Sequence, residues 1–376
     1  MYEPFQIFVK PAGPACNLNC GYCYYLEKKS LYPAAGSFRM NEPVLENYII
    51  QHFEASCENP IMFSWHGGEP LLAGIGFFRE ALRLQKKYQP PDAVILNGIQ
   101  TNGTLIDDEW CRLFADERFM VGISLDGPEP YHGRFRKDLR GDSSFGKVIN
   151  GLTLLKKYRI SFEILCVVSS FNSLFPHDVY RFFRDLGAEF ITFLPLLIRV
   201  PGTKSMVTDA SVSPVEFGDF LSAVFDEWLE HDIGRIKIQI VEEALRTAFG
   251  QDHTLCIFKE TCGRVPVIEH NGDFYSCDHF VDPSHLVGNI REGKLAGFIE
   301  SERQIIFGKE KYTTLPYYCR KCEVLKMCNG ECPKNRFIMT PDGEEGLNYL
   351  CAGYRKFFNH CRPFIQSVAE VWSARE

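Results

Sequence analysis

Short apolar runs alternate with amphipathic stretches through the first 200 residues of the chain. The six apolar runs are FQIFVKPA, IMFSWHGGEP, AVILNGIQTNG, FMVGISLDGP, SFEILCVVSS and EFITFLPLL. Stretches with the apolar spacing of an amphipathic helix lie between them, among them residues 41–55, 76–88, 145–158 and 177–187. Apolar strands that alternate with helices indicate parallel strands covered on at least one face. The pattern predicts an α/β fold with six β/α units, an incomplete (β/α)6 barrel.

This alternation ends near residue 210. Residues 214–231 and 237–249 have helical spacing, and the pair Asn271-Gly272 in RVPVIEHNGDFYSCDHF predicts a two-residue hairpin turn. The last apolar pattern, YLCAGYRKFFNHCRPFIQSVAEVW, predicts a closing helix. We expect a barrel domain over residues 1–235 and a cysteine-rich domain with the hairpin and the closing helix over residues 236–376.

Motifs rich in glycine and polar residues stand at the carboxyl ends of the first five predicted strands. In chain order they are Cys16-Cys20-Cys23, Gly67-Gly68-Glu69-Pro70, Gln100-Thr101-Asn102-Gly103, Ser124-Leu125-Asp126-Gly127-Pro128 and Ser169-Ser170-Phe171-Asn172. In barrels of this kind the carboxyl-end rim is where active sites are built. Because all five motifs follow the carboxyl ends of strands, they predict one catalytic face.

Composition and charge exclude several classes of partner. The chain has 376 residues, of which 45% are hydrophobic and 24% charged, and its formal net charge is -7. This acidic balance argues against a nucleic acid or an anionic membrane as the main partner, because both require a basic surface. No apolar run approaches the roughly 20 residues that span a bilayer, and the start MYEPFQIFVKPAG does not look like a signal peptide. We expect a cytoplasmic protein.

Fifteen cysteines in a chain without an export signal are the strongest oddity of the sequence. Cytosolic thiols are kept reduced, so clustered cysteines there more often hold metal than form disulfides. Eleven fall into three groups, which are Cys16, Cys20 and Cys23; Cys256, Cys262 and Cys277; and Cys319, Cys322, Cys328, Cys332 and Cys351. The four that stand apart, Cys57, Cys111, Cys166 and Cys361, are expected to be buried as small hydrophobic side chains.

The segment CNLNCGYCYY carries three cysteines with the spacing Cys-x-x-x-Cys-x-x-Cys. Three such thiolates can bind three irons of a cubane 4Fe–4S cluster and leave the fourth iron open. Placed after a first strand and before a helix, this triplet resembles the signature of the radical S-adenosylmethionine (SAM) superfamily. The resemblance implies that SAM closes the cluster and is cleaved reductively to a 5′-deoxyadenosyl radical. A partial zinc knuckle or a chance cluster are the alternatives.

Other strand-end residues resemble the cofactor contacts of the same superfamily. By this resemblance, the predicted SAM-binding residues are Tyr22, Gly67, Gly68, Glu69, Asn102, Ser124 and Arg136. Glu69 would lie near the SAM ammonium, and the planar guanidinium of Arg136 suits a carboxylate. Taken singly, the Gly-Gly-Glu-Pro turn could be structural, and Arg136 could be a surface arginine in RFRKDLR.

The later cysteines resemble the extension called SPASM, which in its full form carries two auxiliary 4Fe–4S clusters. The resemblance implies that Cys256, Cys262, Cys277 and Cys332 hold the first, and Cys319, Cys322, Cys328 and Cys351 the second. Such interleaved ligation occurs in ferredoxin-type proteins. Zinc is the alternative, since tetrathiolate sites also suit that ion.

The motifs KPAGPACNLNCGYCYYLEK, HGGEPLLAG, QTNGTLID, SLDGPEPYH and NGDFYSCDHF together resemble the anaerobic sulfatase-maturating enzymes, over nearly the whole chain. Such enzymes oxidise a cysteine or serine in a Cys/Ser-x-Pro-x-Arg motif of an unfolded sulfatase to Cα-formylglycine. The resemblance implies hydrogen abstraction by the adenosyl radical, deprotonation by Asp278, and loss of one electron to the auxiliary clusters. It also implies a low-potential electron donor such as flavodoxin or ferredoxin. Asp278 could instead only accept hydrogen bonds beside the cluster.

One residue departs from the family pattern. Many maturases have glutamine before the glycine pair, whereas this chain has His66. His66 and Tyr24 are expected to line the substrate pocket, because both stand on the predicted rim. The nearest rival function is a radical SAM/SPASM enzyme that forms a thioether, a C–C bond or an epimer on another ribosomal peptide. An electron-transfer protein and a zinc-stabilised interaction protein are the rivals from other classes.

Overall fold

The structure is a computed structural model that describes residues 4–33 and 38–373. Its strands are β1 (Phe8–Val9), β2 (Ile61–Trp65), β3 (Ile95–Thr101), β4 (Met120–Ser124), β5 (Phe162–Val168), β6 (Phe190–Pro195), β7 (Lys237–Ile238), β8 (Val267–Ile268), β9 (Asp273–Tyr275), β10 (Leu286–Asn289), β11 (Arg336–Ile338) and β12 (Leu347–Asn348). Its α-helices are α1 (Glu42–Ala55), α2 (Ile75–Tyr88), α3 (Asp108–Asp116), α4 (Glu129–Phe135), α5 (Phe145–Lys157), α6 (Pro176–Asp185), α7 (Pro214–His231), α8 (Gln239–Ala248), α9 (Leu295–Ile299), α10 (Glu302–Thr313), α11 (Tyr317–Arg320), α12 (Leu325–Cys328) and α13 (Cys351–Ser373).

The six predicted strands and the helical stretches between them are present. Strands β1 to β6 fall within the six apolar runs. Helices α1, α2, α5 and α6 each begin within one residue of the predicted first residue. Sequence analysis did not single out α3, a short helix whose beginning is fixed by Asp107. The Asp107 carboxylate accepts hydrogen bonds from the backbone N–H groups of Glu109 and Trp110, as an N-cap does.

The contacts divide the chain into two compact units, each built from separate segments. The first unit comprises residues 1–124, 133–162 and 263–308, and the second comprises residues 125–132, 163–262 and 309–376. The domain boundary expected at residue 235 falls inside a segment of the second unit, and it stays a prediction.

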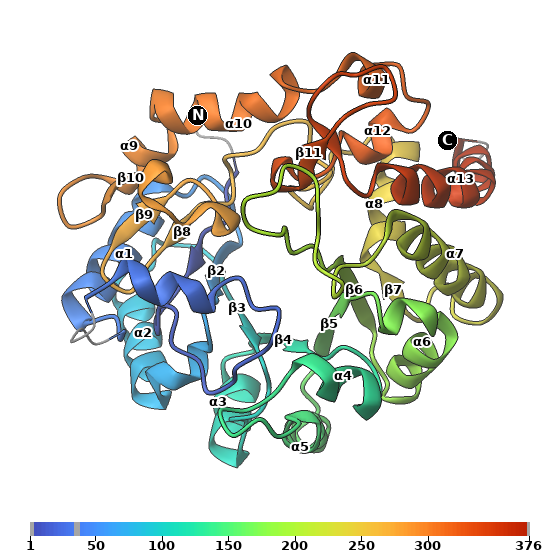
Figure 1. Cartoon of the computed structure of the whole chain (residues 1–376). Coiled ribbons are helices and arrows are strands. Elements are labelled where there is room, and N and C mark those ends of the chain that lie inside the picture. Colours follow the sequence, from blue (N-terminus) through green and yellow to red (C-terminus); the bar gives the residue numbers. More distant parts are fainter. Residues whose placement is uncertain (1–3, 34–37, 374–376) are drawn as a thin grey trace. The chain divides into compact units, whose positions relative to one another are not determined.

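The first unit contains a mostly parallel sheet with the strand order β10-β9-β8-β1-β2-β3-β4. Strands β8, β1, β2, β3 and β4 pair in parallel, so their carboxyl ends share one edge. Figure 1 shows α1, α2 and α3 along the outside of β2 to β4. Their apolar faces and those strands bury large side chains such as Trp65, Phe63 and Phe78, which are less than 2% exposed. Apolar burial of this kind is the main stabilising term of such a layer.

The predicted hairpin exists, but its turn is one residue longer than expected. Strands β8 and β9 pair antiparallel with Val267 opposite Tyr275 and Ile268 opposite Phe274. The backbone N–H of Glu269 donates to the carbonyl of Asp273, which leaves residues 270–272 as a three-residue turn. Gly272 closes it with φ 90°, a left-handed conformation that glycine adopts without strain. The two-residue prediction was therefore wrong by one position in register.

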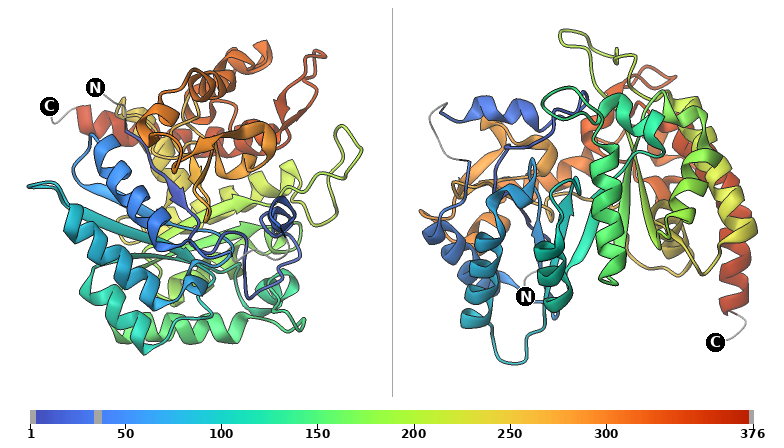
Figure 2. Two further views of the ribbon diagram at one scale, coloured as in Figure 1. Left: turned by 90° about the vertical axis from the view of Figure 1, so that its left-hand side faces the viewer. Right: turned by 90° about the horizontal axis from the view of Figure 1, so that it is seen from below.

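The second unit contains strands β5, β6 and β7, which pair in parallel. The predicted helices over 214–231 and near the end of the chain are α7 and α13. Helix α7 begins with a capping box, in which Ser213 and Glu216 bond each other's backbone N–H groups. Figures 1 and 2 show α13 beside α7, and the rings of Phe217 and Tyr354 pack edge to face at 5.3 Å between them. This helix pair supports the cysteine-bearing loops of the unit.

The isolated cysteines were predicted correctly in three of four cases. Cys111, Cys166 and Cys361 are fully buried, whereas Cys57 is exposed just after α1. Cys57 lies in the polar segment SCENP, which has no apolar neighbours to bury it. Within residues 4–33 and 38–373, no helix combines the length and the apolar character that crossing a membrane requires.

Candidate active site

The three-cysteine loop follows β1 and lies within the first unit. Its thiols are partly buried and form no disulfide. The Cys16 Sγ accepts the Leu18 backbone N–H at 3.4 Å and the Asn102 side-chain amide at 3.8 Å. The Gly21 N–H donates to the Phe135 carbonyl at 2.9 Å. The loop is therefore held by backbone bonds on one side and by a residue of the β3 carboxyl end on the other.

The Gly-Gly-Glu-Pro motif holds the cysteine loop from the end of β2. Gly68 N–H donates to the carbonyl of Gly13 at 2.9 Å, and Glu69 N–H donates to that of Ala15 at 2.8 Å. A Cβ on Gly68 would lie 2.2 Å from the Ala15 carbonyl oxygen, a separation that no side chain tolerates. Glycine is therefore required here because the two backbones touch.

Glu69 is fully buried behind this contact, and its carboxylate is hydrogen-bonded from β3. It accepts from Thr101 Oγ1 at 2.7 Å and from the Asn102 N–H at 2.8 Å. Burial raises the pKa of Glu69 to about 7, although these hydrogen bonds and one from the Leu71 N–H oppose the shift. Among the described residues of this unit, none forms an ion pair with Glu69, and a buried carboxylate of this kind favours a positively charged ligand beside it.

Two further pairs of predicted residues come together in the first unit. The Tyr22 ring lies 5.5 Å from the guanidinium carbon of Arg136, a cation–π contact, and Arg136 is buried rather than on the surface. Ser124, at the end of β4, accepts a hydrogen bond from the Gln100 side-chain amide at 3.1 Å. These residues lie at or beyond the carboxyl ends of the strands, where the sequence motifs predict them.

Asp278 lies directly after the hairpin and forms an ion pair with a buried lysine of the same unit. Its carboxylate lies 2.5 Å from the Nζ of Lys10, which is 2% exposed, and accepts the Tyr24 hydroxyl at 2.6 Å. Burial would raise the pKa of Asp278, but the charges of Lys10 and His279 and the hydrogen bonds from Lys10 and Tyr24 hold it well below its usual value. Asp278 is therefore an ionised, fixed carboxylate.

Aromatic rings surround this ion pair. The Lys10 Nζ lies 4.4 Å from the centre of the Tyr25 ring, and the Tyr25 hydroxyl donates to the buried carboxylate of Glu269. His66 stacks on Phe8 with ring centres 3.9 Å apart. Burial and the Lys10 charge lower the pKa of His66 to about 3, so its imidazole is neutral at physiological pH. The two predicted pocket residues, Tyr24 and His66, thus belong to the surroundings of Lys10 and Asp278.

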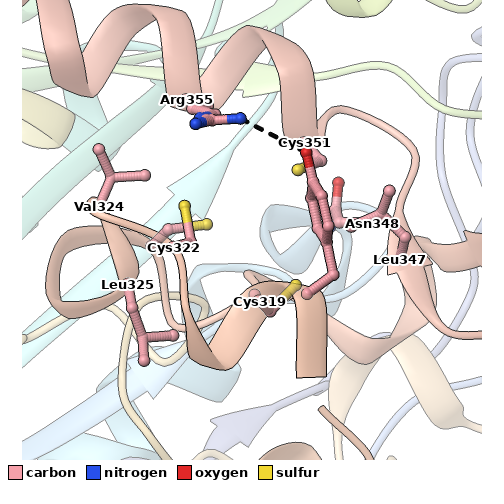
Figure 3. A pocket seen from close by; sticks show the side chains of 11 residues that line it. Cys319, Cys322, Val324, Leu325, Leu347, Asn348, Cys351 and Arg355 are labelled. Carbon is pink, nitrogen blue, oxygen red and sulfur yellow. Dashed lines mark hydrogen bonds between the residues drawn. The ribbon is translucent and has the colours of Figure 1, made fainter. Parts of the chain in front are cut away.

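Four cysteines of the second unit line one apolar pocket. It is bounded by Cys319, Cys322, Cys328 and Cys351, and apolar side chains such as Val324, Leu325 and Leu347 complete its wall. Figure 3 shows the sulfur atoms of Cys319, Cys322 and Cys351 facing this pocket. Arg355 borders it and forms an ion pair with Glu323 at 2.7 Å on the exposed side. These are the four residues expected to hold the second auxiliary cluster.

The other cysteine group is divided between the units. Cys256, Cys262 and Cys332 belong to the second unit, and Cys277 belongs to the first. In the second unit the Lys311 Nζ donates to the Cys256 carbonyl at 2.8 Å, and burial lowers the pKa of Lys311 while the charges of the three thiols raise it. The predicted four-residue set therefore stays a prediction as regards Cys277.

The donor sets fit iron–sulfur clusters. All fifteen cysteines lie in the described ranges, and none of them forms a disulfide. Among the same residues, no three His, Cys, Asp or Glu side chains are placed to bind a single metal ion. In a cubane each thiolate binds a different iron, so its ligands stand farther apart than those of one zinc ion. Sulfur ligands in an apolar wall, with N–H groups donating to Cys16, suit this chemistry.

The sequence analysis missed several residues that contact or hold the predicted site residues. No role was assigned to Lys10, Lys311, Arg336 or Thr101, although Lys10 stands in the quoted motif KPAGPACNLNC. A lysine that directly follows an apolar strand is a signal that could have found Lys10. The segment GKEKYT, which contains Lys311, reads as an ordinary solvated helix face, and no pattern distinguishes its buried lysine.

Two family models match the chain. The model of the Radical SAM superfamily matches residues 11–177, and that of SPASM, an iron-sulfur cluster-binding domain, matches residues 260–323. These matches confirm the predicted order of a radical SAM region followed by a cysteine-rich region. The two domains imply a SAM-binding 4Fe–4S cluster and auxiliary clusters.

Curated relatives match nearly the full chain. It is 43% identical over 376 residues to the serine-type anaerobic sulfatase-maturating enzyme of Bacteroides thetaiotaomicron, with 96% of this chain and 91% of that protein covered. It is 32% identical over 368 residues to the cysteine-type anaerobic sulfatase-maturating enzyme of Clostridium perfringens, with 97% and 98% covered.

A solved structure has the same fold. It is described as "Native anSMEcpe with bound AdoMet and Cp18Cys peptide", and it matches with a TM-score of 0.88 and 32% sequence identity over 98% of this chain and 99% of that one. This likeness confirms the predicted fold class, and the description places SAM and a peptide on that protein.

Proposed function

We propose that this chain, which belongs to the family of anaerobic sulfatase-maturating enzymes, oxidises one serine or cysteine of a sulfatase polypeptide to Cα-formylglycine. Its relatives include both serine-type and cysteine-type enzymes, and the more similar of the two named above is serine-type. A serine peptide is therefore the first substrate to test. The substrate would be a Cys/Ser-x-Pro-x-Arg segment, and the electron donor a low-potential protein such as flavodoxin or ferredoxin.

The cluster ligands are assigned to the residues whose surroundings fit them. The SAM-binding cluster would be held by Cys16, Cys20 and Cys23. SAM would contact Tyr22, Gly67, Gly68, Glu69, Asn102, Ser124 and Arg136. One auxiliary cluster would be held by Cys256, Cys262, Cys277 and Cys332, and the other by Cys319, Cys322, Cys328 and Cys351. The buried, unpaired carboxylate of Glu69 supports an ammonium contact, and the shared pocket of the last four cysteines supports the second set.

The observation that carries the proposed reaction is the fixed carboxylate of Asp278 beside a cluster cysteine. When bound, SAM and its cluster supply the radical that takes one hydrogen atom from the substrate Cβ. Loss of that hydrogen makes the adjacent hydroxyl or thiol more acidic, and the Lys10 ion pair keeps Asp278 in the ionised form that can accept a proton. Asp278 would take this proton, and its contacts with Lys10 and Tyr24, which fix the carboxylate, support this role.

The proposed reaction is balanced in atoms and electrons for both substrates. A serine loses a hydrogen atom from Cβ, a proton from the hydroxyl to Asp278 and one electron to the auxiliary clusters, which leaves the aldehyde. A cysteine loses the same three particles and leaves a thioaldehyde, which water converts to the aldehyde with release of hydrogen sulfide. Tyr24 and His66 would hold the peptide near this carboxylate, since both border the Lys10–Asp278 pair.

The first test is anaerobic incubation of the cluster-loaded enzyme with SAM, a reductant and a serine or cysteine peptide. Mass spectrometry should show loss of two hydrogens from serine, or the aldehyde from cysteine, with 5′-deoxyadenosine formed alongside. Deoxyadenosine with an unchanged peptide would instead favour the second candidate, modification of a different ribosomal peptide. Absence of deoxyadenosine from the fully loaded enzyme would contradict the radical reaction itself.

The variant Asp278→Asn tests the proposed base. We expect about 10²–10⁴-fold slower peptide oxidation, the usual contribution of a positioned general base, while SAM cleavage persists. Asp282→Asn is the matched control, because Asp282 stands on the same loop but bonds only local groups such as Ser284 and His285. Unimpaired oxidation in Asp278→Asn would remove the base assignment. Cys16→Ala should abolish both reactions.

A further inference from the structure

Helix α10 buries a lysine that has no acidic partner. The Lys311 side chain is 1% exposed, and its Nζ donates to the carbonyls of Cys256 and Ile257, at 2.8 Å each, and of Lys259. In the part of the chain that the structure describes, no carboxylate is ion-paired with it. Burial lowers the pKa of Lys311, and its carbonyl partners provide hydrogen bonds but no opposite charge, so the ammonium charge is poorly screened.

A second cation reinforces the first. The guanidinium of Arg336 donates only to carbonyls, those of Gly330 at 2.8 Å, Asn329 at 2.7 Å, Glu331 at 3.1 Å and Lys311 at 2.5 Å. The two cations are thus joined through the Lys311 backbone, and the charge of Arg336 lowers the pKa of Lys311. Buried like charges of this kind require a compensating negative charge nearby.

The available acid is a weak candidate for that role. Glu331 is 3% exposed and accepts hydrogen bonds from the side-chain amides of Asn335 at 3.0 Å and Asn348 at 2.6 Å. Burial raises its pKa, despite these bonds. The Glu331 carboxylate is hydrogen-bonded to amides and acts on the two cations through its charge alone, so it offsets at most one of two positive charges.

The thiols of one cysteine group supply the missing negative charge. Cys256, Cys262 and Cys332 all act on Lys311 electrostatically, and Lys311 in turn lowers the pKa of Cys256 and of Cys262. We propose that Lys311 and Arg336 form a fixed positive charge that raises the reduction potential of the auxiliary cluster bound by these three cysteines, so that it accepts the electron released by the substrate. The identity of the electron's source rests on the proposed function. The effect of the two cations on the reduction potential does not depend on it.

The physical reason is the charge of the cluster. A 4Fe–4S cluster with thiolate ligands is an anion, and its negative charge grows by one on reduction. A cation fixed at short range in a poorly screened site therefore stabilises the reduced form more than the oxidised form. Net charge and hydrogen bonding around a cluster are recognised levers on its potential. Lys311 and Arg336 are thus positioning residues for electron transfer and do not touch the substrate.

The test is a redox titration of the cluster-loaded protein, followed by electron paramagnetic resonance. Lys311→Gln removes the charge and keeps an amide that can still donate to carbonyls. We expect its midpoint potential to become more negative for one auxiliary cluster, while the others stay unchanged. Lys311→Arg should restore the potential. Lys309→Gln is the matched control, because Lys309 is exposed on the same helix, and it should behave as the unaltered protein.

Iron content decides how each outcome is interpreted. If Lys311→Gln does not retain its iron, the titration is made on Arg336→Gln. A negative shift is expected there for both auxiliary clusters, because the Arg336 charge acts on Cys319 and Cys328 as well as on Cys262. An unchanged potential in a variant with full iron would overturn the proposal. Loss of iron from both variants would also overturn it, because the cations would then build the site rather than set its potential. The peptide assay is independent, so failure of either proposal leaves the other distinguishable.

Discussion

The two most deeply buried lysines of this protein lie in different units and have opposite surroundings. Lys10, in the first unit, is 2% exposed and forms an ion pair of 2.5 Å with Asp278. Lys311, in the second unit, is 1% exposed and donates to three neutral carbonyls. A charge that is cancelled by its neighbour fixes geometry, whereas a charge left uncancelled acts on whatever anion lies within its field.

This contrast assigns different tasks to the same residue type. Lys10 orients and ionises a carboxylate beside the proposed substrate pocket, where proton transfer would occur. Lys311 contacts the Cys256 backbone and acts on three thiols through its charge, where an electron would arrive in the proposed reaction. The contrast extends to the carboxylates, because Asp278 with its lysine has a lowered pKa, whereas Glu69 without a cation has a raised one. Each predicted effect below depends on whether a buried charge has its partner.

The largest effect is expected from Lys10→Met. This change leaves the Asp278 carboxylate buried and unpaired, and breaking a buried ion pair in this way costs about 3–5 kcal/mol. Thermal unfolding of the anaerobically purified protein should shift accordingly, and peptide oxidation should fall with it. The double variant Lys10→Met with Asp278→Asn should recover stability but not oxidation. If the single variant were as stable as the parent, the ion pair would not hold Asp278.

The next effect is a pH dependence of SAM binding that depends on Glu69. Because its pKa is raised to about 7, Glu69 is ionised above that pH and protonated below it. An ammonium ligand favours the ionised form, so SAM affinity should be constant above pH 8 and fall by up to about tenfold per pH unit below 7. Equilibrium dialysis at several pH values measures this. Glu69→Gln should bind weakly at every pH, and an equally steep profile in that variant would refute the assignment.

The smallest effect is expected from Tyr24→Phe. The phenyl ring keeps its packing but removes one hydrogen bond of 2.6 Å to Asp278, while the Lys10 ion pair remains. Hydrogen bonds to charged groups contribute about 1.5–3 kcal/mol, so peptide oxidation should slow by roughly tenfold to a hundredfold. Steady-state kinetics with the peptide separates an effect on kcat from one on KM. A loss as severe as that of Asp278→Asn would mean that Tyr24, and not Lys10, controls the carboxylate.

The parts of the fold that follow from local patterns were predicted well. Six apolar runs became strands, and a Ser–Pro start with glutamate at the third helical position fixed α7. The hairpin turn was misjudged by one residue, because Asn-Gly is compatible with both two-residue and three-residue turns and the pairing of β8 with β9 chose between them. Cys57 was misjudged because a lone cysteine carries no local sign of whether apolar neighbours will reach it.

The candidate site divides in the same way. The cysteine spacings and the strand-end motifs are local, so the residue types were visible before the structure. That Arg136 is buried against Tyr22, and that Asp278 meets Lys10, depends on segments more than 100 and more than 250 residues apart in the chain. The sequence does not distinguish buried lysines such as Lys10 and Lys311 from solvated lysines. Only their three-dimensional surroundings do.

The sequence by itself determined the chemistry of this protein, because sulfur ligands at fixed spacing and glycines at backbone contacts are properties of neighbouring residues. Tertiary structure alone decided which charges are cancelled and which are not. The energy of a buried charge depends on the partners and the polarity within a few ångströms, and folding brings those partners from distant segments. That is why Lys10 and Lys311, indistinguishable in sequence, come to serve a proton and an electron respectively in the proposed reaction.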